Sequence, residues 1–155
     1  MTYIGIDPGK KGGIAVLEER EGGEKKISAY PYTDDTLKSV CSTQIVNSCF
    51  CIVEKVSAMP KQGVTSTFHF GQSFGYILGV LEANEIPYQL VTPKTWKKHY
   101  GLNDDKGKSI ETAKRLFPTV SLLPTDRCRV ESDGMAEALL MALYAMRVDR
   151  GGSGK

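Results

Sequence analysis

The sequence lacks any long apolar segment. No apolar run approaches the roughly 20 residues that an α-helix needs to cross a bilayer, so we expect no membrane partner. The first residues lead directly into a strand pattern, and we expect neither a signal peptide nor a transit peptide. Internal repeats and a domain linker are also missing, and 155 residues suit one domain with a substantial core.

The cysteines lack the paired spacing of a zinc site. The chain has Cys41, Cys49, Cys51 and Cys128, with no CxxC pair and no histidine placed to complete one. Cys49 and Cys51 lie within an apolar run, so we expect buried thiols. This pattern argues against bound zinc and fits a reducing compartment.

A strong net charge is also missing, since 20 basic and 18 acidic residues leave +2. This balance favours no class of partner, but the charge is unevenly distributed. Between residues 92 and 115, seven Lys or Arg residues accompany three acids, so this segment carries +4 and the remainder −2. A local basic patch is typical of a phosphate-binding surface, although a solvated helix face has the same composition.

Among the features that are present, residues 2–13 predict a β-hairpin with an acidic residue at the end of its first strand. An apolar strand ends at Asp7, and two Pro-Gly or Gly-Gly pairs supply the backbone angles of a tight reversal before the second strand. An acid at a strand end is held rigidly, as metal or phosphate chemistry requires. A lone Asp-Pro-Gly is also a common turn, so Asp7 is informative only if other carboxylates converge on it.

The rest of the chain predicts a mixed α/β fold. Strands are expected at 2–7, 13–18, 25–31, 49–54 and 87–91, and helices at 34–47, 67–84, from 93, from 106 or 108 to 116, and at 131–146. A meander followed by alternating helices and strands gives one mixed five-stranded sheet with helices on both faces. We assign residues 1–148 to one domain and 149–155 to a flexible tail.

Three further carboxylates stand at special positions. Glu54 ends its strand, and Asp133 and Glu137 lie four residues apart on one face of the last helix. Asp133 suits a helix N-terminus, whereas Glu137 lies inside an apolar segment and needs a positive group opposite it. If the strands that end at Asp7 and Glu54 are parallel neighbours, all four acids can meet.

Four carboxylates in one place need cations to offset their repulsion. Oxygen ligands favour hard ions, so we expect Mg²⁺, with Mn²⁺ as a substitute. Two such ions about 4 Å apart clamp a phosphodiester, activate water and stabilise the leaving oxygen. The sequence therefore predicts a site of two metal ions, beside a basic segment that holds a nucleic-acid backbone.

The helix expected at 67–84 contains an unusual glycine repeat. Gly71, Gly75 and Gly79 recur every four residues, although each glycine costs a helix about 1 kcal/mol. We expect a groove there for close approach of another backbone or helix.

Six motifs occur in order along nearly the whole chain, from residue 3 to 147. They are IGIDPG (4–9), VEKV (53–56), FGQSFG (70–75), VTPKTWKK (91–98), KGKS…AKRLFP (106–118) and DGMAEALLMALY (133–144). Together they resemble the RuvC-like Holliday junction resolvases of the RNase H-like superfamily, especially their phage and plastid relatives. Each motif alone is weak, and their combination in this order is specific.

The resemblance implies an RNase H-like fold and a metal-dependent endonuclease. Such an enzyme resolves four-way DNA junctions by paired symmetric nicks that leave 5′-phosphates. The resemblance matches Asp7, Glu54, Asp133 and Glu137 with the metal-binding acids of the family. It matches Lys108 with a basic residue used near the scissile phosphate, and Lys97 more loosely with the same role.

The resemblance also implies partners and a location. We expect DNA contacts from Lys55, Lys61, Lys94, Lys97, Lys98 and Lys106. A homodimer is implied, with the glycine-rich helix as part of its interface. The expected location is the cytoplasm of a bacterial or phage-infected cell, or an organelle matrix after removal of a transit peptide.

Two departures from the bacterial pattern are visible. The last helix carries an Asp and a Glu four apart, instead of two Asp three apart, so we expect an altered metal geometry. The aromatic residue that wedges into the junction after the strand-end glutamate is missing, and Met59 or Phe68 is expected in its place. We expect His69 and His99 to face the surface or DNA rather than to act as catalytic bases.

Three other functions share parts of this pattern. Sugar kinases and actin-like ATPases begin with a similar hairpin, but they need two lobes and a longer chain. A catalytically inactive junction-binding module has no need for all four acids. The main alternative is a general RNase H-type nuclease that acts on other branched DNA or on RNA–DNA hybrids.

Overall fold

The computed structural model describes residues 1–20, 22–43, 48–57, 63–102 and 106–152. Two residues named above, Met59 and Lys61, lie outside these ranges, as does the side chain of Lys106. The same holds for residues 44–47, the last part of the first expected helix.

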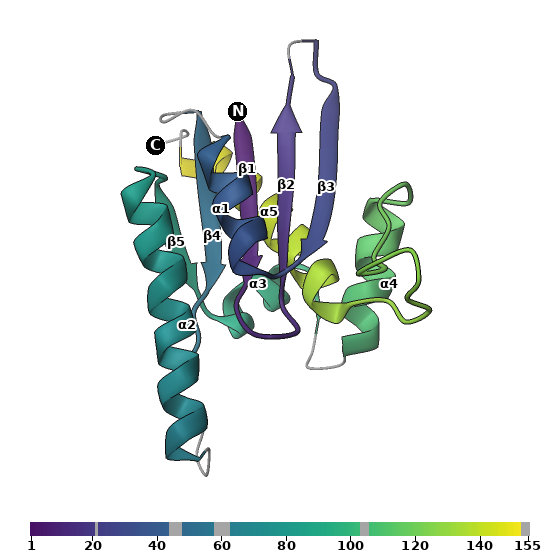
Figure 1. Cartoon of the computed structure of the whole chain (residues 1–155). Helices are drawn as coiled ribbons and strands as arrows, with labels where there is room; N and C mark the ends of the chain where they lie inside the picture. The colour runs from purple at the N-terminus through teal and green to yellow at the C-terminus, as the bar shows by residue number, and fades with distance from the viewer. Residues whose placement is uncertain (21, 44–47, 58–62, 103–105, 153–155) are drawn as a thin grey trace.

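Five strands form one mixed sheet in the order β3-β2-β1-β4-β5 (Figure 1). The strands are Thr2–Asp7 (β1), Gly13–Glu19 (β2), Lys25–Pro31 (β3), Cys49–Glu54 (β4) and Tyr88–Val91 (β5). β1 is antiparallel to β2 and parallel to β4, so the strand that ends at Asp7 lies beside the strand that ends at Glu54. The predicted mixed five-stranded sheet is confirmed.

Helices cover both faces of the sheet, as predicted. They are Asp34–Ser42 (α1), Val64–Ala83 (α2), Pro93–His99 (α3), Lys106–Leu116 (α4) and Asp133–Gly152 (α5). In Figure 1, α1 and α2 lie in front of the sheet and α5 runs behind it. The side chains of β1 alternate accordingly: Ile4 and Ile6 pack with α1 and α2, whereas Tyr3 packs with α5.

The last helix begins later and ends later than predicted. It starts at Asp133 instead of residue 131, because the Ser132 side chain accepts a hydrogen bond from the Met135 amide at 3.2 Å and caps the helix. It continues to residue 152, so the first residues of the expected tail are helical. Tyr3 donates to Asp149 at 3.0 Å, and Arg150 pairs with Glu19, which fixes these last turns to the sheet.

Two glycines let α5 lie directly against β1 and the first hairpin. A Cβ atom at Gly5 would collide with the backbone of Ala138 and Ala142, and one at Gly134 would collide with the backbone of Lys11 and of the adjoining glycine. The close approach places the first turns of α5 above the end of β1. The position of Glu137 therefore depends on these two contacts.

The other long helix, α2, leaves one face uncovered. It begins at Val64, three residues earlier than predicted, because the carbonyl of Gly63 accepts the Thr67 amide. Among the described residues, nothing lies within 4 Å of a Cβ built at any of its three glycines, and Phe68 is 69% exposed. The structure thus shows an open glycine face, and the approach of a partner there stays a prediction.

All four cysteines are free thiols, and Cys41, Cys49 and Cys51 are buried in the core beneath α1 and α2. The predicted burial of Cys49 and Cys51 is confirmed, whereas the cellular location stays a prediction. Within the described residues, no helix is both long and apolar enough to span a membrane.

Candidate functional site

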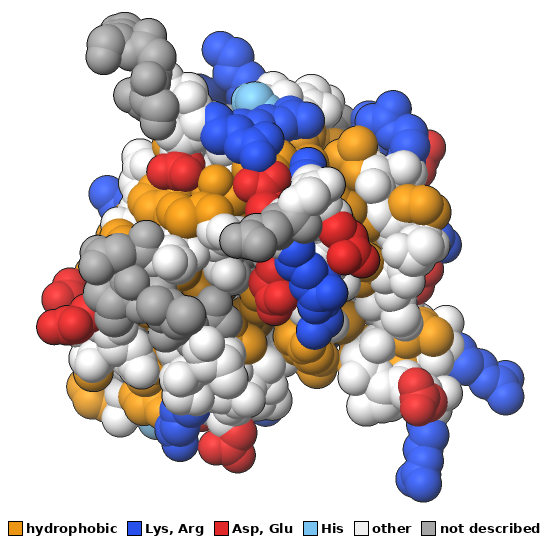
Figure 2. Space-filling view, turned by 90° about the horizontal axis from the view of Figure 1, so that it is seen from above, with side chains coloured by type: hydrophobic (Ala, Val, Ile, Leu, Met, Phe, Trp, Pro, Cys, Tyr) orange, Lys and Arg blue, Asp and Glu red, His pale blue; other side chains and the backbone are white. Residues whose placement is uncertain are grey.

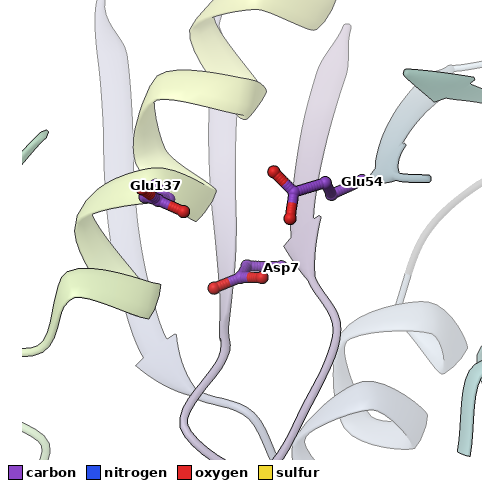
Figure 3. Close-up of side chains that lie close together, drawn as sticks. All are labelled: Asp7, Glu54 and Glu137. Carbon is purple, nitrogen blue, oxygen red and sulfur yellow. The ribbon is translucent and has the colours of Figure 1, made fainter. Parts of the chain in front are cut away.

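Three of the four predicted acids meet at one end of the sheet. Asp7 comes from the end of β1, Glu54 from the end of β4, and Glu137 from α5, and Figure 3 shows the three side chains turned toward one another. One carboxylate oxygen of each lies within 4.8 Å of one oxygen of each of the others. The predicted convergence of Asp7, Glu54 and Glu137 is confirmed.

The strand register explains this convergence. Ile6 pairs with Val53 in the parallel β1–β4 ladder, so the next residues, Asp7 and Glu54, leave the sheet at the same level. Because side chains alternate along a strand, Asp7 and Glu54 face the same side as Tyr3 and Ile52, which is the side covered by α5. The acids therefore point toward the helix that carries Glu137.

Glu54 is held by the only tryptophan of the chain. The fully buried indole of Trp96, on α3, donates a hydrogen bond from Nε1 to Glu54 Oε1 at 2.9 Å. Thr92 caps the start of α3 by accepting the Thr95 amide, and Pro93 fixes the first helical residue. This short helix thus positions one carboxylate of the site.

Glu137 is held by two groups at the same oxygen. Lys97 Nζ lies 3.0 Å from Glu137 Oε1, and the buried Ser109 hydroxyl donates to that oxygen at 3.1 Å. The sequence predicted a positive group opposite Glu137, and in the structure this group is Lys97. Since Lys97 lies on α3 and Ser109 on α4, both basic helices contact the acidic site.

The acids alter one another's protonation. Burial raises the pKa of Asp7 well above its ordinary value, and the charges of Glu54, Glu137 and Asp133 raise it further, while Lys97 lowers it. Burial also raises the pKa of Glu54, against the opposing effects of the Trp96 hydrogen bond and Lys97. The site is thus an enclosed group of like charges that favours protons or other cations.

Asp133 lies near this group without being one of its three closest members. It begins α5, one turn before Glu137, and its charge acts on Asp7. A set of three clustered carboxylates with a fourth nearby fits the oxygen ligands that Mg²⁺ and Mn²⁺ prefer. Asp7, Glu54 and Glu137 are therefore the residues best placed to hold such an ion.

The predicted lysines that the structure describes differ in depth. Lys97 is half-buried against the acids, whereas Lys94 and Lys98 are exposed and line, with Lys97, a hollow of about 760 Å³. Lys108 is exposed next to Ser109, and Lys55 is exposed next to Glu54. Their predicted contacts with DNA stay predictions.

The opposite end of the molecule shows a different charge pattern. Figure 2 looks down on that end, and Lys and Arg side chains are interspersed there with Asp and Glu. Ion pairs at the β2–β3 hairpin and the end of α5 account for part of this pattern, among them Lys25–Glu19 and Arg150–Glu19. The lysines of α3, by contrast, lie beside the acidic site.

Both histidines are exposed, as predicted. His69 lines a second hollow of about 720 Å³ together with Gly9 and Lys10, next to the turn that follows Asp7. His99 lies against Arg147, with 2.6 Å between Nε2 and Nη1, and packs edge-on against Tyr100 and Tyr144. Burial and the Arg147 charge lower the pKa of His99.

Sequence reasoning missed Trp96 and Ser109 as partners of the acids. Trp96 stood within a motif between lysines, and Ser109 directly after Lys108, but neither lies near its partner in the sequence. The signal that could have identified them is that each interrupts a basic helix: Trp96 is the single tryptophan of the chain, and Ser109 is a small polar residue among lysines.

Comparison with known proteins identifies the fold. No family model matches the sequence, and no curated protein does either. The chain is similar to a structure of Thermus thermophilus RuvC, with 16% identity, a TM-score of 0.65, and coverage of 98% of this chain and 97% of that chain. It is also similar to T. thermophilus RuvC in complex with a Holliday junction substrate, with 15% identity, a TM-score of 0.67, and coverage of 99% and 98%.

These similarities cover at least 97% of each chain, so the protein has the RNase H-like fold of RuvC. At this identity the similarity establishes the fold alone. The more specific resemblance to phage and plastid relatives stays a prediction.

Proposed function

We propose that this protein is a divalent-metal-dependent endonuclease that resolves four-way DNA junctions by paired nicks. The observation that carries the proposal is the meeting of Asp7, Glu54 and Glu137 at the strand ends of a RuvC-like fold. The similar structure with a Holliday junction substrate supports this choice of DNA. The lysines of α3 and α4 beside the acids supply the charge that a phosphate backbone needs.

The metal-binding residues are Asp7, Glu54 and Glu137, with Asp133 as the fourth acid. When bound, Mg²⁺ or Mn²⁺ supplies Lewis-acid polarisation of the scissile phosphate and a more acidic water, and we propose two ions in each site. Trp96 keeps Glu54 in a fixed orientation. Ser109 does the same for Glu137, so the carboxylates do not need to reorganise during the reaction.

The basic residues orient the DNA. Lys94, Lys97 and Lys98 line a hollow beside the acids, where the phosphodiester next to the scissile bond binds. Lys108 lies at the start of the other basic helix, and we assign it to the scissile phosphate, where its ammonium offsets the charge that develops on the leaving oxygen. We also assign Lys55, Lys61 and Lys106 to contacts with the DNA backbone.

The open face of α2 forms the interface of a homodimer. Its glycines permit close approach of a second backbone, and the exposed Phe68 lies at the start of the same helix. A dimer with two sites cuts two opposed strands of a junction, and each nick leaves a 5′-phosphate.

A general RNase H-type nuclease is the second candidate. Residues 55–57, which directly follow Glu54, contain no aromatic side chain that could wedge into a junction. A site of the same acids without such a wedge would also cut RNA–DNA hybrids or other branched DNA.

Cleavage assays distinguish the two candidates. The protein is incubated with Mg²⁺ and a labelled four-way junction, a linear duplex or an RNA–DNA hybrid of matched sequence. We expect symmetric cutting of the junction in preference to the other substrates, and cutting of the hybrid alone would contradict the proposal. Asp7→Asn should abolish cleavage while junction binding in a gel-shift assay is retained.

A further inference from the structure

Lys97 differs from the other lysines of α3 in direction and in burial. Its Nζ atom lies 3.0 Å from Glu137 Oε1, and its side chain is only 14% exposed. Lys94 and Lys98 are exposed on the same helix. Lys97 Nζ also lies 5.4 Å from the centre of the buried Trp96 ring. Lys97 is therefore folded inward, against the acids.

The ammonium of Lys97 lies where a positive charge is most needed. Carboxylate oxygens of Asp7, Glu54 and Glu137 lie within 4.8 Å of one another, and Lys97 Nζ lies 3.0 Å from the Glu137 oxygen Oε1. A divalent cation held by the same carboxylates has the same sign of charge and repels the ammonium. The two cations therefore compete, whereas the neutral Ser109 hydroxyl can keep its hydrogen bond to Glu137.

A second position for the ammonium lies close by. The hollow of about 760 Å³ is lined by Lys94, Lys97 and Lys98, so Lys97 borders both the acids and this hollow. The four-carbon stem of lysine is flexible and carries a compact charge. A rotation of the side chain would therefore move the ammonium from a carboxylate to a phosphate that is bound in the hollow.

We propose that Lys97 is an exchangeable counter-cation of the acidic site. In the metal-free protein its ammonium offsets the charge of the three carboxylates. When a divalent cation binds, Lys97 leaves Glu137 and turns into the hollow beside Lys94 and Lys98, where it contacts a DNA phosphate. This inference rests on the proposed function, since it requires both a divalent cation and a nucleic acid.

The rate of lysine acetylation in the wild-type protein distinguishes the two positions of the Lys97 ammonium, against Glu137 and in the hollow. In EDTA, brief treatment with the N-hydroxysuccinimide ester of acetic acid should modify the half-buried Lys97 more slowly than Lys94 or Lys98. Saturating Mg²⁺ should accelerate the reaction at Lys97 by about tenfold, equivalent to about 1.4 kcal/mol. The rates at Lys94 and Lys98 should stay constant, which fragment-ion mass spectrometry of the peptides can resolve. An unchanged or lower rate at Lys97 overturns the proposal.

A substitution tests the competition directly. Lys97→Met removes the charge and keeps the aliphatic stem, so Mn²⁺ should bind about tenfold more tightly in the absence of DNA. The paramagnetic resonance signal of free Mn²⁺ reports the affinity. The matched control Lys98→Met removes an exposed charge from the same helix and should change the affinity by less than about twofold. Equal or weaker Mn²⁺ binding by folded Lys97→Met contradicts the exchange. If this variant does not fold, the wild-type acetylation decides.

The failure of this inference is distinguishable from the failure of the proposed function. Wild-type protein that binds no Mn²⁺ and cuts no junction removes the nuclease assignment itself. Wild-type protein that binds Mn²⁺ and cuts junctions, while Lys97 stays protected from acetylation, removes only the exchange.

Discussion

At the scale of single residues, the acids work against the stability of the metal-free protein. The folded state raises the pKa of Asp7 above its ordinary value of 3.8, so it binds a proton more tightly than the unfolded chain does. The stability of the metal-free protein should therefore rise as the pH falls through this raised pKa toward 3.8, until other groups titrate. Above the raised pKa Asp7 is ionised, and its repulsion with the other acids is then present in full.

Asp7→Asn should accordingly stabilise the protein in EDTA at neutral pH. Removing one charge from the group relieves repulsion, and a gain of about 1 kcal/mol raises Tm by roughly 4 °C in a domain of this size. Thermal unfolding followed by circular dichroism across pH measures this effect. The difference between variant and wild type should shrink at acidic pH, and a lower Tm of the variant at neutral pH would mean that Asp7 is structural.

A separate prediction concerns the two residues that donate hydrogen bonds to the acids. Trp96→Phe keeps an aromatic ring in the core but removes the hydrogen bond to Glu54, and Ser109→Ala removes the one to Glu137. Each should weaken metal affinity or cleavage by about 10- to 100-fold. Calorimetric titration with Mn²⁺ and single-turnover cleavage check both. Normal Mn²⁺ affinity in a folded variant would show that the lost donor does not orient its carboxylate.

The sequence predicted the acids better than the groups that hold them. Asp7 and Glu54 end apolar strands, and Glu137 is an acidic residue within an apolar stretch of a helix. Each could therefore be recognised from its neighbours in the sequence. Trp96 and Ser109 acquire their roles through contacts with residues 42 and 28 positions away. Such pairings depend on how α3 and α4 pack, which the local pattern does not encode.

At the scale of the elements, the packing of α5 on β1 determines where Glu137 lies relative to the end of β1. Strand ends were predicted closely, because apolar runs and turn residues mark them. Helix ends were predicted less well, because Ser132 caps α5 and the contact of Tyr3 with Asp149 extends it. The second of these is a contact between distant parts of the chain, so it was not visible in the sequence.

Gly5→Ala tests this packing. The added methyl group would collide with the α5 backbone, so the helix must shift at a cost of about 3 kcal/mol. We expect Tm to fall by roughly 10 °C. The same substitution at Gly151, near the end of α5, meets no described atom within 4 Å and should therefore not lower Tm. A wild-type Tm for Gly5→Ala would contradict the close approach.

At the scale of the whole molecule, the open face of α2 predicts a dimer. Gly75→Glu would place a charge in the centre of the proposed interface and should halve the mass measured by light scattering, without loss of helix content. Ser39→Glu adds the same charge to the exposed face of α1 and should leave the mass unchanged. A monomeric wild-type protein, or a Gly75→Glu variant that stays dimeric, contradicts this interface.

The hydrogen bond between Trp96 and Glu54 has a practical consequence. Because the chain contains a single tryptophan, all of its indole fluorescence originates beside the proposed metal ligands. A change in the charge or contacts of Glu54 alters the electric field at that indole and shifts its emission. The unlabelled protein thus contains its own optical probe, and stopped-flow mixing can establish whether cation loading precedes strand scission.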